Sequence, residues 1–196
     1  MHISEGVLSV PVLAAGWGFA AVGLYAGLKM TPPEKISRTA LFSAVLFLVS
    51  LVRVPVGPAS VHLTMLGLTG VILGRSVIPA LFVALLLQAL LFQFGGLLVL
   101  GTNTVNLGLA AFTGFLLYKY LPAFFPSVLR YFLTGATAVL VGTFFVGFSL
   151  YFSSGAFIAT AKLLFIANLP LALVEGIITA FILSFLQKLL PEYVKP

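Results

Sequence analysis

Residues 77–94 read VIPALFVALLLQALLFQF, eighteen positions in a row without a charged side chain. A helix needs about 20 mostly apolar residues to cross the hydrocarbon core of a bilayer, so this stretch predicts a membrane-spanning helix. The rest of the chain has the same character, because hydrophobic residues make up 61% of the 196 and charged residues only 7%. The mean hydropathy is +1.23. The composition therefore predicts an integral membrane protein.

Proline, glycine and charged residues divide the chain into further apolar segments. The expected spans are residues 7–28, 37–54, 61–74, 77–94, 104–121, 129–151 and 161–190. The third is short and follows Pro55, Gly57 and Pro58, so we expect it to be partly re-entrant and packed inside the protein. The last contains Pro170, which favours a kink or a tilted end. The sequence predicts an all-α membrane bundle of about seven transmembrane helices, forming one domain over residues 1–196.

The distribution of positive charge predicts the orientation. With seven spans and an external amino terminus, eight of the ten Lys and Arg residues fall on the cytoplasmic side, and only Arg53 and Lys162 fall outside. The first apolar segment does not resemble a cleavable signal, because the preceding MHISEG has no Lys or Arg. We attribute the formal charge of +6 to cytoplasmic loops and do not expect nucleic-acid binding.

The first two residues offer a set of nitrogen donors. The α-amine of Met1, the backbone amide nitrogen of His2 and its imidazole can close two fused chelate rings around one metal ion. The only other histidine, His62, is expected at the same outer face. Four nitrogens in a plane suit Ni(II) or Cu(II), and a distorted arrangement suits Co(II). A histidine at position two can also occur by chance, and a histidine at a helix start is often only a hydrogen-bonded polar group, so both interpretations stay open on spacing alone.

Four stretches of the chain resemble the CbiM/NikM family, the substrate-capture subunits of energy-coupling-factor transporters for cobalt and nickel. They are MHISEGVLS, GPASVHLTMLGLTGVILG, LLLQALLFQFGGLLVLGTNTVNLGLAA and LPLALVEGIITAFIL, in the order found in the family. The resemblance implies a seven-helix bundle with the amino-terminal segment inserted into the core. It also implies that Met1, His2 and His62 hold the metal. Related sequences often have a histidine where this chain has Asn168, which puts a metal-relay role at that position in doubt.

The resemblance also implies the setting of the protein. The chain has no phosphate-binding G-x-x-x-x-G-K-[ST] motif and no aspartate, so we expect a transporter subunit without its own ATPase and not an enzyme. The implied partners are a transmembrane coupling subunit, a pair of cytoplasmic ATPases and a small accessory membrane subunit, in the cytoplasmic membrane of a prokaryote. No permanent cofactor is expected. The transported ion is Co²⁺, supporting cobalamin biosynthesis, with Ni²⁺ as the alternative.

Several polar residues in apolar surroundings should point into the bundle, because facing lipid is costly. The resemblance places GTNTVN over the metal segment, which implies that Asn103 and Asn106 hydrogen-bond the amino-terminal backbone or fix the tautomer of His62. Glu175 has either a structural or a functional role, and Glu5 is expected to order the amino-terminal loop. For Gln88 we expect a hydrogen bond between helices.

Two other function classes remain. A vitamin-binding subunit of the same transporter type would have an aromatic-lined cavity and no need for a free amino terminus. An intramembrane hydrolase would need a nucleophile beside a base, and the sequence lacks a G-x-S-x-G turn. Metal binding by the purified protein distinguishes the three.

Overall fold

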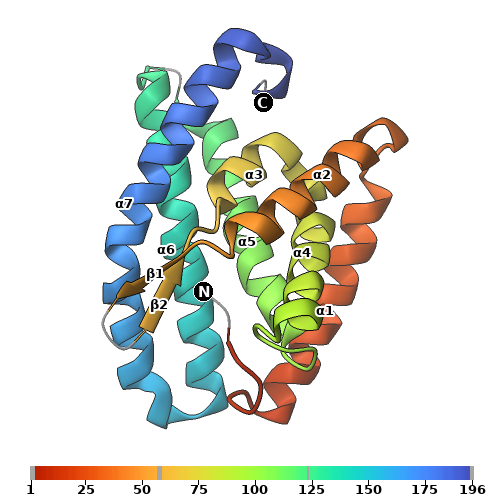
Figure 1. Cartoon of the computed structure of the whole chain (residues 1–196), viewed down its shortest axis with the longest axis vertical. Coiled ribbons are helices and arrows are strands. Elements are labelled where there is room, and N and C mark those ends of the chain that lie inside the picture. Colours follow the sequence, from red (N-terminus) through yellow and green to blue (C-terminus); the bar gives the residue numbers. More distant parts are fainter. Residues whose placement is uncertain (1–2, 57–58, 123, 195–196) are drawn as a thin grey trace.

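The computed structural model describes residues 3–56, 59–122 and 124–194, which form a bundle of helices with one short β-hairpin (Figure 1). The α-helices are α1 (Val10–Lys29), α2 (Pro33–Val49), α3 (Leu66–Leu73), α4 (Val77–Phe92), α5 (Leu100–Tyr120), α6 (Ser127–Ser153) and α7 (Ile158–Leu189). Short 3₁₀ turns follow at Gly74–Ser76, Gly155–Phe157 and Pro191–Tyr193. The strands are β1 (Arg53–Val56) and β2 (Ala59–His62).

The outer surface of the bundle is apolar. Large side chains on several helices point outward, and Phe19, Leu41 and Phe181 are 68%, 62% and 73% exposed. Five segments of the described chain are long and apolar enough to cross a membrane: 10–29, 66–92, 100–120, 127–153 and 155–189. Because such an exterior is stable only against lipid, the chain is a multi-pass membrane helix bundle.

The prediction of seven transmembrane helices is not confirmed. The described chain does contain seven α-helices, but α3 has only 8 residues and is about 12 Å long, which is too short to cross the hydrocarbon core. It continues through a 3₁₀ turn into α4, and the two together make one candidate span, residues 66–92. Helix α2 has 17 residues and is not among the five candidates. The expected inward packing of the third segment is confirmed, since all eight residues of α3 are buried.

A β-hairpin connects the expected second and third spans and includes residues 53–54 of the second and 61–62 of the third. Strands β1 and β2 are antiparallel, and Arg53 pairs with His62 at the open end of the hairpin. The two valines of RVPV and the valine of ASVH favour strands, because β-branched side chains suit an extended backbone. In Figure 1 the hairpin lies across α6 and α7. It therefore delivers His62, the last residue of β2, to the interior of the bundle.

Helices α6 and α7 pack most closely at two glycines. A Cβ atom on Gly135 of α6 would lie 2.7 Å from the carbonyl oxygen of Glu175 in α7. A Cβ atom on Gly176 of α7 would lie 2.7 Å from the ring of Phe132 in α6. Only glycine permits this approach of the two backbones. The contact holds Glu175 against the middle of the bundle.

Candidate metal centre

His62 is buried and its ring has a defined tautomer. Its exposed fraction is 6%, and its Nδ1 atom lies 3.0 Å from the carbonyl oxygen of Leu63. A carbonyl oxygen only accepts hydrogen bonds, so this contact requires the proton on Nδ1 of the neutral ring. The lone pair is then on Nε2. The Leu63 carbonyl therefore fixes the tautomer of His62, a role that we expected of Asn103 or Asn106.

Glu175 fixes the chain immediately after His62. Its carboxylate oxygen Oε1 accepts hydrogen bonds from the backbone N–H of Thr64, from the Thr64 hydroxyl at 3.0 Å and from the Met65 N–H at 3.0 Å. Met65 has a left-handed backbone with φ of 48°, which is uncommon for a residue other than glycine. The carboxylate thus stabilises a strained turn between β2 and α3. Glu175 is 1% exposed, and these contacts satisfy Oε1, whereas Oε2 is buried and has no hydrogen-bond partner among the described residues.

Asn103 anchors the start of the described chain inside the bundle. The N–H of Ile3 donates to Asn103 Oδ1, and Asn103 Nδ2 donates to the Ile3 carbonyl, both at 3.0 Å. The side-chain amide therefore pairs with Ile3 as a neighbouring strand would. Ile3 is 4% exposed and Asn103 is 2% exposed. The expected contact of Asn103 with the amino-terminal backbone is present. Met1 and His2 lie outside the described residues.

Glu5 orders the segment that leads from Ile3 to α1. Its backbone N–H donates to the Gly95 carbonyl, and its Oε1 atom accepts from the Leu98 N–H, both at 2.9 Å. Gly96 has φ of 117°, and a Cβ atom at this position would collide with the Glu5 carboxylate. This contact agrees with the ordering role expected of Glu5.

Asn106 and Asn168 make other contacts. Asn106 exchanges hydrogen bonds with the Ser149 hydroxyl of α6, at 3.1 Å and 3.2 Å, and these bonds link α5 to α6. Asn106 lies three residues after Asn103, so its side chain leaves the helix at a different height and in a different direction. It therefore does not share the partner of Asn103. Asn168 donates from Nδ2 to the Leu164 carbonyl at 2.8 Å, within its own helix. Neither bond involves His62 or Ile3.

Gln88 lies beside His62. Both residues line an internal cavity of about 20 Å³, which Leu107 of α5 also borders. The Gln88 Oε1 atom is buried and has no hydrogen-bond partner in the described part of the protein. The hydrogen bond between helices that we expected for this residue is therefore not seen for Oε1.

The described residues contain no group of three His, Cys, Asp or Glu side chains that could hold a metal ion. Ile3 and the His62 cavity both border on helix α5. Asn103, which holds Ile3, and Leu107, which borders the His62 cavity, are one turn or about 6 Å apart on α5.

A family model for the "cobalt uptake substrate-specific transmembrane region", CbiM, matches residues 2–193. The chain belongs to the CbiM family. It is 35% identical to a Haemophilus influenzae protein provisionally described as a metal transport protein, covering 98% of this chain and 96% of that one. It is 30% identical to the cobalt transport protein CbiM of Lachnoclostridium phytofermentans, covering 94% and 77%. The CbiM protein of Sorangium cellulosum is 31% identical, covering 98% and 93%.

The CbiM fold of this chain is similar to a crystal structure of a transition metal transporter. The TM-score is 0.86 at 25% identity, covering 96% of this chain and 93% of that chain. A second crystal structure, of a truncated transition metal transporter, gives a TM-score of 0.80 at 27% identity, covering 96% and 99%. The family match and the similar fold show that this CbiM chain is a membrane protein involved in metal transport.

Sequence reasoning missed the contacts that hold the His62 turn. Thr64, Met65 and the Leu63 carbonyl were not singled out, because their roles depend on a left-handed turn that apolar sequence does not reveal. The one available signal was Thr64, a hydroxyl two residues after His62 in an otherwise apolar stretch.

Proposed function

We propose that this chain is the substrate-capture subunit of an energy-coupling-factor importer for a divalent transition metal. The ion is held by the Met1 amine, the His2 amide and imidazole, and His62 Nε2. The observation that carries the proposal is the pair of hydrogen bonds between Ile3 and Asn103. They anchor the chain start inside the bundle, about one helical turn from the cavity that His62 lines.

The orientation of this proposal follows from the basic residues of the helices. Lys29, Lys119 and Lys188 lie in the last turns of α1, α5 and α7, which end at the same pole of the bundle in Figure 1. Lys162 lies near the opposite end of α7. Because positive residues favour the cytoplasmic side, this pole faces the cytoplasm of a prokaryotic cell and the chain start faces outward.

Partners complete the transporter. The sequence has no ATP-binding motif, so uphill uptake requires a coupling subunit, two cytoplasmic ATPases and an accessory membrane subunit. The chain itself captures the ion as one domain, without a permanent cofactor and without hydrolysing ATP. Uptake in cells that lack the ATPase pair should fall to background, although the purified chain still binds metal.

Cobalt is the favoured cargo, in support of cobalamin biosynthesis, and the description of the family as a cobalt uptake region supports this choice. Nickel is the alternative, because the same nitrogens accept both ions. Uptake of radioactive ⁵⁷Co²⁺ with increasing unlabelled Ni²⁺ decides between them. Inhibition only at a large excess of nickel supports cobalt, and inhibition at equal concentration supports a shared or nickel-selective site.

The Asn103→Ala substitution is expected to weaken metal binding by about ten-fold or more. The substitution leaves the buried N–H and carbonyl of Ile3 without partners, at a cost of about 1–3 kcal/mol each. Asn106→Ala is the matched control, because it removes a similar amide pair on the same helix without touching Ile3. Titrations should show weakened affinity only for Asn103→Ala, while both variants lower the melting temperature. Equal affinities in the two variants would argue against the anchoring role.

Binding is expected to weaken as the pH falls below about 7. A free imidazole has a pKa of about 6.5 and an α-amine of about 7.7–8.0, and both must lose their protons to bind a metal ion. Protons therefore compete with the ion, and affinity falls with acidity. Titration from pH 5 to pH 8 measures this, and an affinity that stays constant over the range would exclude the proposed nitrogen donors.

A further inference from the structure

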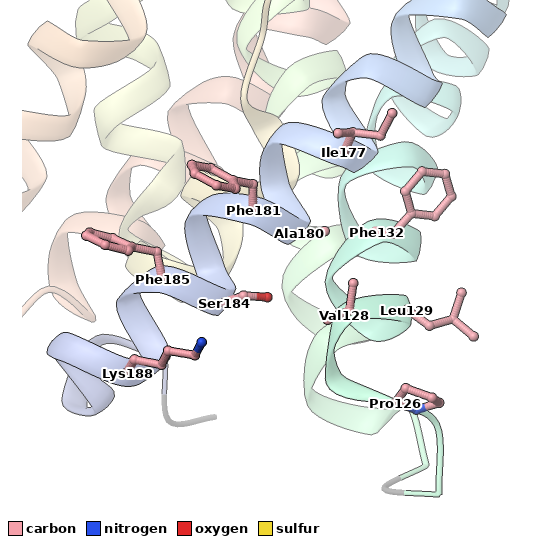
Figure 2. Close-up of a pocket in the computed structure, with 10 residues that line it drawn as sticks. All are labelled: Pro126, Val128, Leu129, Phe132, Ile177, Ala180, Phe181, Ser184, Phe185 and Lys188. Carbon is pink, nitrogen blue, oxygen red and sulfur yellow. The ribbon is translucent and has the colours of Figure 1, made fainter.

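A deep apolar groove lies between α6 and α7 at the pole where α7 ends (Figure 2). Its volume is about 740 Å³. On α6 it is bordered by Val128, Leu129 and Phe132, and on α7 by Ser184 and Lys188. Both helices are long and apolar enough to cross a membrane.

The groove exists because the two helices diverge from a narrow crossing point. Gly135 and Gly176 bring the backbones into contact, as described above. Beyond this point the facing residues are larger, and Figure 2 shows the ribbons separating toward Pro126 and Lys188. The side chains of α6 do not fill the gap. A groove of this size has room for an elongated apolar molecule.

The hydroxyl of Ser184 is unusual within this protein. Nine other serines and threonines in the described helices donate to the carbonyl four residues earlier: Thr39, Ser43, Thr69, Thr104, Thr113, Thr134, Thr143, Ser149 and Ser153. The Ser184 oxygen is buried and has no partner within the described residues. Figure 2 shows it pointing from α7 into the gap toward α6. Such a hydroxyl is a donor that is ready for an acceptor on a ligand.

Lys188 places a positive charge one turn beyond Ser184. Four residues of helix correspond to about 6 Å, so the ammonium lies nearer the membrane surface than the hydroxyl. Figure 2 shows both polar atoms on the same side of α7. The same pole carries Lys29 and Lys119 at the ends of α1 and α5. An anionic group is therefore favoured at the mouth of the groove.

We propose that this groove binds an anionic phospholipid. One acyl chain lies between α6 and α7, a glycerol ester carbonyl accepts a hydrogen bond from Ser184, and the phosphate pairs with Lys188. The ester carbonyls of a phospholipid lie just below its phosphate, in the order of the two side chains.

Native mass spectrometry of delipidated protein, titrated with phosphatidylglycerol or phosphatidylcholine of equal chain length, tests the proposal. The wild type should prefer phosphatidylglycerol about five-fold, which corresponds to ~1 kcal/mol for one lysine near the surface. Lys188→Gln should abolish the preference, and Ser184→Ala should weaken both lipids. These exposed or half-buried positions are not in the core, and an unchanged elution volume confirms folding.

Lys162→Gln is the matched control. Lys162 lies on the same helix and borders a smaller groove of about 350 Å³ between α6 and α7, where the neighbouring Thr143 hydroxyl already donates to the Val139 carbonyl. This variant should keep the preference for phosphatidylglycerol. Equal binding of both lipids to the wild type, an equal loss in Lys162→Gln, or a dimer that excludes lipid and is broken by Lys188→Gln would each overturn the proposal.

Discussion

A protein with a peptide tag fused ahead of Met1 is expected to lose high-affinity metal binding and metal uptake. The fusion converts the α-amine into an amide, which removes one donor, and it lengthens a segment that Asn103 holds inside the bundle at Ile3. Loss of groups that only orient a ligand costs about 10–100-fold in affinity, so loss of a ligand should cost more than about 100-fold. Calorimetric titration with Co²⁺ and Ni²⁺ measures the effect.

The matched control carries the same tag after Pro196. This end of the chain follows α7, at the pole opposite the start of α1 in Figure 1, so the tag should leave binding intact. A protease that removes the amino-terminal tag and leaves Met1 as the first residue should restore binding. Native affinity in the uncleaved protein would show that the amine is not a ligand.

The second large effect is expected for His62→Ala. It removes the one proposed ligand that lies within the described structure, where the Leu63 carbonyl contacts Nδ1 of the ring. The Glu175 contacts with Thr64 and Met65 do not involve the imidazole, so the turn should persist and the protein should still fold. Binding should fall by more than about 100-fold, as for loss of the amine.

Thermal unfolding and elution volume serve as the folding controls for His62→Ala. His2→Ala should reproduce its binding defect, because the two imidazoles are proposed to share one ion. Full-strength binding by either variant would remove that histidine from the site.

Much of the bundle could be predicted from the sequence because the residue types at the helix ends are recognisable. The expected spans 77–94 and 129–151 correspond to α4 and α6, since Pro, Gly and charge bound each apolar run. Helix α4 ends at Phe92, and Gly95 and Gly96 then adopt positive φ angles. Residues that end a helix act locally, so they can be recognised without knowing what packs against the helix.

The hairpin and α3 could not be predicted with the same certainty. Residues 61–74 are as apolar as a spanning helix, and hydropathy does not distinguish a short buried helix from a membrane span. Burial distinguishes the two cases. All eight residues of α3 are buried within the bundle, whereas a membrane span exposes one face to lipid. The β-branched residues of the hairpin were the available signal, and a helical interpretation of the whole segment obscured them.

The contacts around Ile3 and His62 could be predicted only in part. Asn103 was expected to reach the amino-terminal backbone and does so, but Asn106 was given the same role and bonds Ser149 instead. Both are buried amides on α5. They have different neighbours because their side chains leave the helix in different directions. Glu175 is 111 residues from Thr64, and no local sequence pattern predicts that they are in contact.

The absorption spectrum of the nickel-loaded protein tests the proposed site most directly. Four nitrogens, including a deprotonated amide, enforce a planar geometry, so the complex should be yellow and diamagnetic with one Ni²⁺ per chain. The spectrum should be lost in His62→Ala and in the protein extended ahead of Met1. A pale, paramagnetic complex that persists in both proteins would show a site built from oxygen donors and would contradict capture by the chain start and His62.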